Sequence, residues 1–173
     1  MKKTIRAFII FLFIVLSTLL LWGIINRRNN RRVSADRISR LPCFTMSSLK
    51  SGQYSTSEIM EGPVLVVRFH PECEHCRYEI SGIMNSTIPS SCARVLFITD
   101  ADSGSAAKLF SKYDLKAYVT IRVLIDTSYI FEDIFGKSIV PSNYLYGKDL
   151  ELSKVFFGEV KTETLLRYLN NIE

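Results

Sequence analysis

The stretch PVLVVRFHPECEHC, residues 63–76, carries most of the information about the fold. Residues 63–70 form a continuous apolar and β-branched run, which is typical of a strand buried on both faces. After the first cysteine, apolar side chains recur at helical spacing: Cys76, Ile80, Ile83 and Met84. A second apolar run at 93–100 repeats the strand pattern. These residues therefore predict a strand–helix–strand unit with the two cysteines where the helix begins.

The rest of the chain from residue 41 predicts one α/β domain, a mixed sheet flanked by helices. After Asp100 we expect a helix with Ala107, Phe110 and Leu115 turned inward. The other expected elements are a small upstream hairpin at 43–48 and 52–56, a strand at 121–125, a short helix or turn that packs Tyr129, Phe131 and Phe135 on the sheet, two strands within 142–158, and an amphipathic helix at 161–172.

An uncharged, nearly all-apolar segment at residues 7–25 precedes the domain. It is long enough to cross a bilayer core of about 30 Å, and no small-residue cleavage site follows it. We therefore expect an uncleaved membrane anchor at 1–26, a basic juxtamembrane linker at 27–40 and the folded domain at 41–173.

The net charge of +5 is unevenly distributed. Residues 1–40 hold nine Lys or Arg and one acid (+8), and residues 41–173 hold thirteen and sixteen (−3). Basic residues beside a span interact with lipid headgroups, so we expect no nucleic-acid partner. Six of the arginines follow the span, and positive charge usually stays on the cytoplasmic side. Taken alone, that rule places the domain in the cytoplasm.

The two cysteines at a strand-to-helix junction predict a redox pair. Cys73 lies at the helix start, where free backbone N–H groups and the helix dipole favour a thiolate. Cys76 lies one turn along, close enough to form a disulfide with it. Two alternatives remain: a copper or zinc site that adds His70 and His75, and ordinary structural thiols.

The sequence resembles a known family. VLVVRFHPECEHC, the glutamate three residues after the second cysteine, and IVPSNYLY before a hairpin and terminal helix are similar to thioredoxin-fold thiol–disulfide oxidoreductases. With the upstream hairpin and the anchor, the chain is most similar to the TlpA/ResA-like membrane-tethered branch, over about residues 41–172. The resemblance implies a thioredoxin-like fold and protein disulfide oxidoreductase activity without an organic cofactor.

The resemblance also assigns roles to individual residues. Cys73 corresponds to the nucleophile and Cys76 to the resolving cysteine. Pro141 corresponds to a cis-proline that faces the disulfide, and the Val140 backbone would pair with an extended substrate segment. Glu79 corresponds to a partly buried acid that relays protons as the pair opens and closes. A solvent-facing helix glutamate is the alternative for Glu79.

The residues between the cysteines are expected to tune the redox couple in opposite directions. His75 stabilises the Cys73 thiolate and makes the disulfide more oxidising, whereas Glu74 opposes that thiolate. Strong oxidants of this fold carry histidine at the position of His75, and tethered reductants often carry glutamate at that of Glu74. We expect a reductase, with an oxidant as the alternative. Val67 replaces the family's usual buried aspartate, which leaves Glu79 as the main internal acid.

The expected partners are a disulfide-containing protein substrate and an upstream membrane thiol donor. The family resemblance implies a cytoplasmic-membrane protein whose domain faces the periplasm or cell exterior, against the arginine pattern. Cys43 and Cys92 could form a second disulfide that joins the hairpin to the sheet. Otherwise they are small apolar residues.

Overall fold

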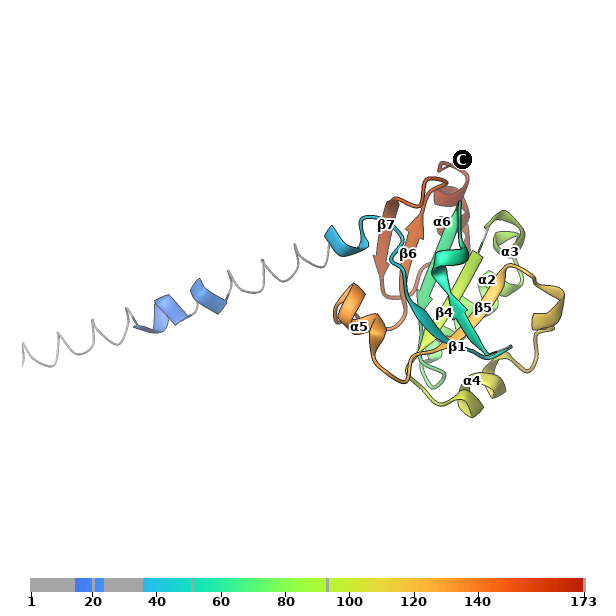
Figure 1. The fold of residues 1–173 in the computed structure, drawn as a ribbon, viewed down its shortest axis with the longest axis horizontal. Helices are drawn as coiled ribbons and strands as arrows, with labels where there is room; N and C mark the ends of the chain where they lie inside the picture. The colour runs from blue at the N-terminus through green and yellow to red at the C-terminus, as the bar shows by residue number, and fades with distance from the viewer. Residues whose placement is uncertain (1–14, 20, 24–35, 51, 93, 173) are drawn as a thin grey trace, which may run out of the picture. The chain divides into compact units, whose positions relative to one another are not determined.

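Seven strands form one mixed sheet in the order β2-β1-β5-β4-β3-β6-β7 (Figure 1). The computed structural model describes residues 15–19, 21–23, 36–50, 52–92 and 94–172. The strands are β1 Thr45–Ser48, β2 Gln53–Ser55, β3 Val64–Arg68, β4 Arg94–Thr99, β5 Ile121–Ile125, β6 Ser142–Tyr146 and β7 Leu152–Phe157. β3, β4 and β5 are parallel and the other pairs are antiparallel. The predicted mixed sheet and the upstream hairpin are confirmed.

The central strand β3 is buried along its whole length because both faces of the sheet are covered. Side chains alternate between the faces of a strand. Leu65 and Val67 join the core cluster under α2, α4 and α6, while Val64 and Val66 join the cluster under α5 and the β1–β2 hairpin. The helices are α2 Glu74–Met84, α3 Ile88–Ser91, α4 Ser103–Phe110, α5 Ile130–Phe135 and α6 Thr162–Leu169, with short 3-10 helices η1 Thr56–Glu58 and η2 Leu115–Ala117.

Helix α2, which follows β3, contains the whole predicted apolar stripe from Cys76 to Met84. It ends at Met84, and the separate helix α3 follows with Pro89 in its first turn. Proline fits the first turn of a helix but not its interior, since it lacks an N–H group and clashes with the preceding turn. The proline therefore accounts for a second helix start.

Helix α4 is rotated relative to the prediction. Ala106 and Phe110 face the core and Ala107 is exposed, so the inward placement of Ala107 is wrong. Asp102 caps the helix by accepting a hydrogen bond of 2.9 Å from the N–H of Ser105, and residues four apart share a face. Leu115 lies beyond α4 in η2, where it packs half-buried against the core.

Helix α5 covers the other face of the sheet with two of its three predicted aromatics. Phe131 and Phe135 stack at 4.4 Å between ring centroids, and both rings pack on Tyr144. Tyr129 has a left-handed φ of 56° and is 58% exposed, so its predicted packing on the sheet is wrong. The buried carboxylate of Asp126 caps α5 by accepting hydrogen bonds from the N–H groups of Ile130 and Phe131.

The chain divides into two units, Met1–Asp36 and Arg37–Glu173. Most of the predicted span at 7–25 lies outside the described residues, although 15–19 and 21–23 are helical. Within the part of the chain that the structure describes, no helix is both long and apolar enough to span a membrane.

The folded domain starts before residue 41. Ile38 is 7% exposed in the core, and the N–H of Leu152 donates to the carbonyl of Ser39 at 2.7 Å. Residues 37–40, which the sequence assigns to the linker, therefore belong to the domain. A soluble fragment should begin at or before Arg37.

We expect Gly62→Ala to destabilise the domain. The N–H of Gly62 donates to the carbonyl of Lys148 at 3.0 Å, and a Cβ at position 62 would overlap the carbonyl oxygen of Gly147. Backbone atoms cannot move aside as a side chain can, so we expect a loss of about 2 kcal/mol in the free energy of unfolding. Urea unfolding measures it. Gly104→Ala, at an exposed position of helix α4, is the control and should change stability little, because its Cβ would meet only the flexible side chain of Asp102. Equal free energies of unfolding for the two variants would contradict the expected overlap at position 62.

Candidate active site

Cys73 is the N-cap residue of α2, at the end of the loop that follows β3. Its N–H donates to the carbonyl of His70 at 3.0 Å, which fixes the turn. Its sulfur accepts a hydrogen bond of 3.2 Å from the N–H of Cys76. This N–H is one of the donors that a helix start leaves unpaired, so the first turn of α2 favours negative charge on the Cys73 sulfur.

Cys76 differs from Cys73 in access to solvent. Its side chain is fully buried in the core, whereas Cys73 is partly exposed. Burial raises the pKa of Cys76 to about 12, and the Cys73 thiol and the charge of Glu79 add to the effect. Cys76 is therefore a thiol at neutral pH, and it needs a base before it can attack.

The peptide bond between Val140 and Pro141 is cis, as predicted. The Cys73 thiol points at the carbonyl oxygen of Val140 over 3.9 Å. The carbonyl of Pro141 accepts a hydrogen bond of 2.9 Å from the N–H of Gly158, which ties this segment to the end of β7. The structure thus brings Cys73, Cys76, Val140 and Pro141 together from three parts of the chain. A second cis bond, between Gly62 and Pro63, has no counterpart in the sequence analysis.

Glu79 is buried, with 2% of its surface exposed, so the alternative of a solvent-facing helix glutamate is wrong. One carboxylate oxygen, Oε1, accepts a hydrogen bond of 3.0 Å from Nδ2 of Asn143 on β6. The other, Oε2, accepts one of 2.6 Å from the N–H of Val160. Burial raises the pKa of Glu79 to about 7, the two hydrogen bonds lower it, and the charge of Glu159 raises it again. A carboxyl group that titrates near neutrality can both take and give a proton.

The fold of this chain is similar to that of proteins of known structure. No protein-family model matches the chain, and no curated protein matches it in sequence. Solved structures match most of the domain. MTB dsbF aligns with a TM-score of 0.66 at 15% identity, over 79% of this chain and 97% of its own. The chain has the thioredoxin fold.

Two further structures show the same likeness. A secreted Mycobacterium tuberculosis disulfide oxidoreductase homologous to E. coli DsbE has a TM-score of 0.65 at 16% identity, over 79% of this chain and 98% of its own. A secreted thiol–disulfide isomerase from Corynebacterium glutamicum has a TM-score of 0.63 at 18% identity, over 76% of this chain and 84% of its own. The thioredoxin-like fold that the sequence predicts is therefore confirmed.

Within this thioredoxin fold, the residues between the cysteines point outward. The His75 side chain is 74% exposed, and its Nδ1 lies 2.5 Å from Oε2 of Glu159. Glu74 is exposed in the first turn of α2. The sequence analysis missed Glu159, which lies 84 positions from His75, because no local pattern indicates this contact.

The four residues of the alternative metal site do not form one group. His75 faces Glu159, and Nδ1 of His70 accepts a hydrogen bond of 3.3 Å from the N–H of Glu72. Across the described residues, no three His, Cys, Asp or Glu side chains gather in a way that could hold a metal ion.

Cys43 and Cys92 are free thiols in different environments. Cys43 is exposed, and its neighbour Phe44 packs in the core cluster under α5. Cys92 is 3% exposed in the cluster on the other face of the sheet, and burial raises its pKa to about 12. The structure does not pair these two cysteines.

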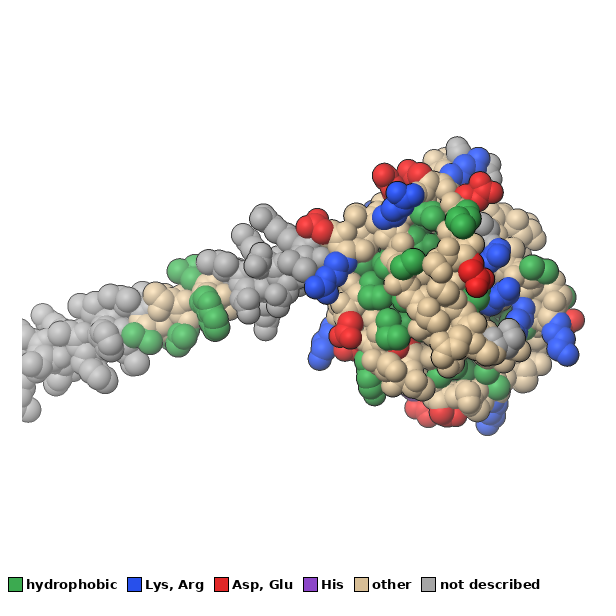
Figure 2. Space-filling view, viewed as in Figure 1, with side chains coloured by type: hydrophobic (Ala, Val, Ile, Leu, Met, Phe, Trp, Pro, Cys, Tyr) green, Lys and Arg blue, Asp and Glu red, His purple; other side chains and the backbone are tan. Residues whose placement is uncertain are grey.

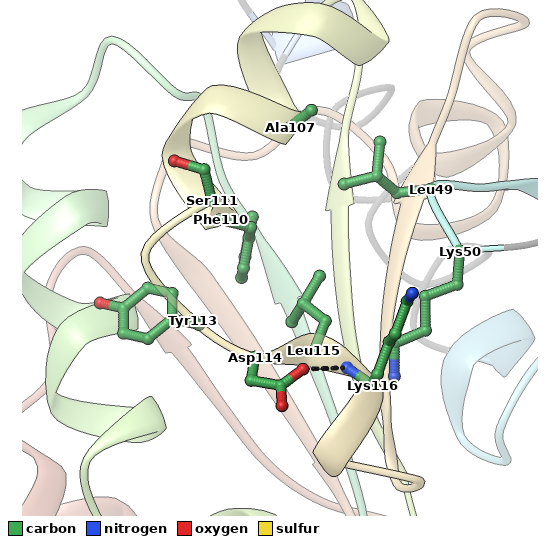
Figure 3. Close-up of a pocket in the computed structure, with 9 residues that line it drawn as sticks. All are labelled: Leu49, Lys50, Ala107, Phe110, Ser111, Tyr113, Asp114, Leu115 and Lys116. Carbon is green, nitrogen blue, oxygen red and sulfur yellow. Dashed lines mark hydrogen bonds between the residues drawn. The ribbon is translucent and has the colours of Figure 1, made fainter.

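Two large hollows lie near the surface of the described part of the domain. A groove of about 840 Å³ between α2 and α6 is lined by Glu79, Glu159 and Val160, so Glu79 borders a path to solvent despite its burial. The other hollow, of about 560 Å³, lies between the end of β1 and the α4–η2 segment (Figure 3). Lys50 and Lys116 lie at its side, and none of the predicted site residues lines it.

The face of the domain drawn in Figure 2 carries basic and acidic side chains with apolar ones between them. This mixture agrees with the nearly balanced charge of the domain sequence, in which thirteen Lys or Arg accompany sixteen acids after residue 40.

Proposed function

We propose that this chain is a thiol–disulfide oxidoreductase that reduces disulfides in partner proteins through Cys73 and Cys76. One observation carries the proposal: a partly exposed cysteine caps α2 beside a cis-proline, while a fully buried cysteine follows one turn later with a buried carboxyl group near it. This arrangement gives the two sulfurs different tasks, attack and resolution.

The first step is attack by the Cys73 thiolate on one sulfur of a partner disulfide. A bond forms between that sulfur and Cys73, and the partner's own S–S bond breaks. The second partner sulfur leaves as a thiolate and takes a proton from water. An extended partner segment would lie along Val140 and Pro141, whose position beside the Cys73 sulfur supports this role.

The second step releases the partner. Glu79 takes the proton of Cys76, and the resulting thiolate attacks the Cys73 sulfur. The bond between Cys73 and the first partner sulfur breaks, and that sulfur leaves as a thiolate and takes a proton from water, while Cys73 and Cys76 form a disulfide. Two electrons have then passed to the partner. A membrane thiol donor returns two electrons and two protons to the pair, and Glu79 releases its proton to solvent.

The contact between His75 and Glu159 supports reduction as the direction. A protonated His75 alone would stabilise the Cys73 thiolate and make the disulfide oxidising. The Glu159 carboxylate beside it balances that charge. Oxidation of partner thiols by the same pair is the alternative.

We further propose that the domain is tethered to the cytoplasmic membrane and faces the periplasm or cell exterior. The uncharged apolar segment at 7–25 supports the tether. Thiol–disulfide chemistry on partner proteins supports the compartment, because disulfides persist outside the reducing cytosol. Nothing in the balanced charge of the domain favours a nucleic-acid partner.

A trapping experiment tests the proposed function. In Cys76→Ser the second step is blocked, so we expect the full chain to accumulate in mixed disulfides with partner proteins through Cys73. These appear as slower bands on non-reducing gels that vanish with reductant. Cys73→Ser should form none of them. Equal bands from both variants would show that Cys73 is not the attacking residue.

A further inference from the structure

Among the described residues, Asn143 supplies the one side-chain hydrogen bond to the Glu79 carboxylate, and its own carbonyl oxygen has no partner. The residue is fully buried on β6, opposite Val67 of β3. Its Nδ2 donates to Oε1 of Glu79 at 3.0 Å. Its Oδ1 is buried and has no hydrogen-bond partner among the described residues. An unpaired buried carbonyl destabilises the folded state, so its presence beside Glu79 calls for a reason.

Both hydrogen bonds of the Glu79 carboxyl group suit its ionised form. Both carboxylate oxygens accept hydrogen bonds, one from Asn143 and one from the N–H of Val160. A protonated carboxyl group needs an acceptor for its O–H. The Val160 N–H belongs to the backbone and cannot become an acceptor, so of these two partners only Asn143 can accept from a proton held on Oε1. With the Asn143 amide oriented as in the structure, the O–H group of the acid would then point at the Nδ2 donor.

The charged and titratable groups around Glu79 come from three elements. On α2, Cys76 interacts with it and is coupled to Cys73. On the segment after β7, Glu159 faces it and pairs with His75. At the start of α6, Lys161 and Glu163 line the same groove. Among the described residues, none of these side chains hydrogen-bonds to the Glu79 carboxyl group, so Asn143 is the side chain that can respond to its proton.

We propose that Asn143 is a positioning residue whose side-chain amide flips when Glu79 gains or loses its proton. It donates from Nδ2 to the carboxylate, and it accepts at Oδ1 from the carboxylic acid. The inference rests on the proposed function of Glu79 as the base for Cys76. When Glu79 takes the Cys76 proton, the new O–H group on Oε1 donates to Oδ1. When the proton leaves, Nδ2 returns. One amide thus satisfies both forms of the acid, and the orphaned oxygen gains its partner in the protonated form.

The first test is the titration of Glu79 in Asn143→Leu, which is similar in size and has no polar atoms. The carboxylate loses a donor, and charged hydrogen bonds exceed neutral ones in strength. We therefore expect the midpoint of the Glu79 titration to rise by about 1 pH unit in the reduced full chain. Carbon-13 NMR of the labelled side-chain carboxyl in detergent micelles measures it. Asn143→Thr, whose hydroxyl can donate or accept, should return part of the shift. An unchanged midpoint in a folded Asn143→Leu would overturn the proposal.

The second test uses the unmodified chain and does not depend on whether a variant folds. The side-chain N–H₂ resonances of Asn143 should change with pH at the same midpoint as Glu79, because Nδ2 loses its carboxylate partner when the acid is protonated. In Glu79→Gln, the glutamine amide donates to Oδ1, so these resonances should stay fixed in the low-pH position. Resonances that do not follow Glu79 in the unmodified chain would contradict the turning amide.

Neither titration requires turnover. If Cys76→Ser fails to trap partners while Asn143 follows the Glu79 proton, the proposed function fails and the positioning role stands. If trapping succeeds and Asn143 does not respond to the Glu79 proton, the proposed function stands and the positioning role fails.

Discussion

Replacing Cys73 with serine is expected to lower the rate of catalysed disulfide exchange by at least about 10³-fold, since removal of an enzyme's nucleophile removes most of its rate enhancement. A serine hydroxyl cannot form a disulfide, so it cannot replace the sulfur that lies at the start of α2 beside the Cys76 N–H. Reduction of insulin disulfides by the full chain, with dithiothreitol as the electron donor, measures the rate.

Cys43→Ser is the matched control for this loss. Cys43 is also a free thiol and is exposed, but it lies in the segment before β1 and outside the site. Its replacement should leave the rate unchanged. A rate that falls equally in both variants, or in neither, would show that exposure alone, rather than the position at the helix start, makes a thiol of this chain reactive.

Replacing Glu79 with glutamine is expected to stabilise the reduced protein above neutral pH. Its pKa rises from an ordinary 4.5 to about 7 on folding, chiefly through burial. Between these values the unfolded chain has lost a proton that the folded chain keeps, so the stability of the unmodified protein falls as pH rises through this window. The loss is complete above about pH 7 and amounts to about 3 kcal/mol.

The glutamine variant lacks this titration. The two proteins should differ least near pH 4.5, where Glu79 is protonated in the folded state, and the variant should gain up to about 3 kcal/mol by about pH 8. Urea unfolding of the reduced full chain at both pH values measures the difference. Glu61→Gln removes an exposed carboxylate before β3 and should show no such gain. Parallel pH profiles for the unmodified chain and Glu79→Gln would mean that Glu79 ionises in the folded state as it does in the unfolded one.

The sequence reveals the part of the site that local patterns encode. An apolar run that stops at a turn, followed by helical spacing, places Cys73 at a helix start and Cys76 on the buried face. Both positions depend on neighbours within a few residues. The cis bond before Pro141 and the internal position of Glu79 are predicted only through the family resemblance. A proline before a strand is usually trans, and a helix glutamate usually faces solvent.

The contacts that complete the site join distant segments. Glu159 meets His75 across 84 positions, and Asn143 meets Glu79 across 64. The one local signal for Asn143 was a polar residue within the apolar strand pattern SNYLY. The misplaced Ala107 and Tyr129 have local causes, since Ala106, four residues before Phe110, takes the inward position on α4, and Tyr129 has a left-handed backbone.

The reduction potential of the Cys73–Cys76 couple tests the central claim most directly. The full chain is equilibrated in buffers of defined thiol–disulfide potential, and the two thiols are counted by alkylation, with Cys43→Ser and Cys92→Ser present to remove the other sulfurs. We predict a two-electron couple with a potential near or below about −250 mV, as for a protein disulfide reductase. A value near about −120 mV would mark an oxidant, and failure to form any disulfide between Cys73 and Cys76 would contradict the account as a whole.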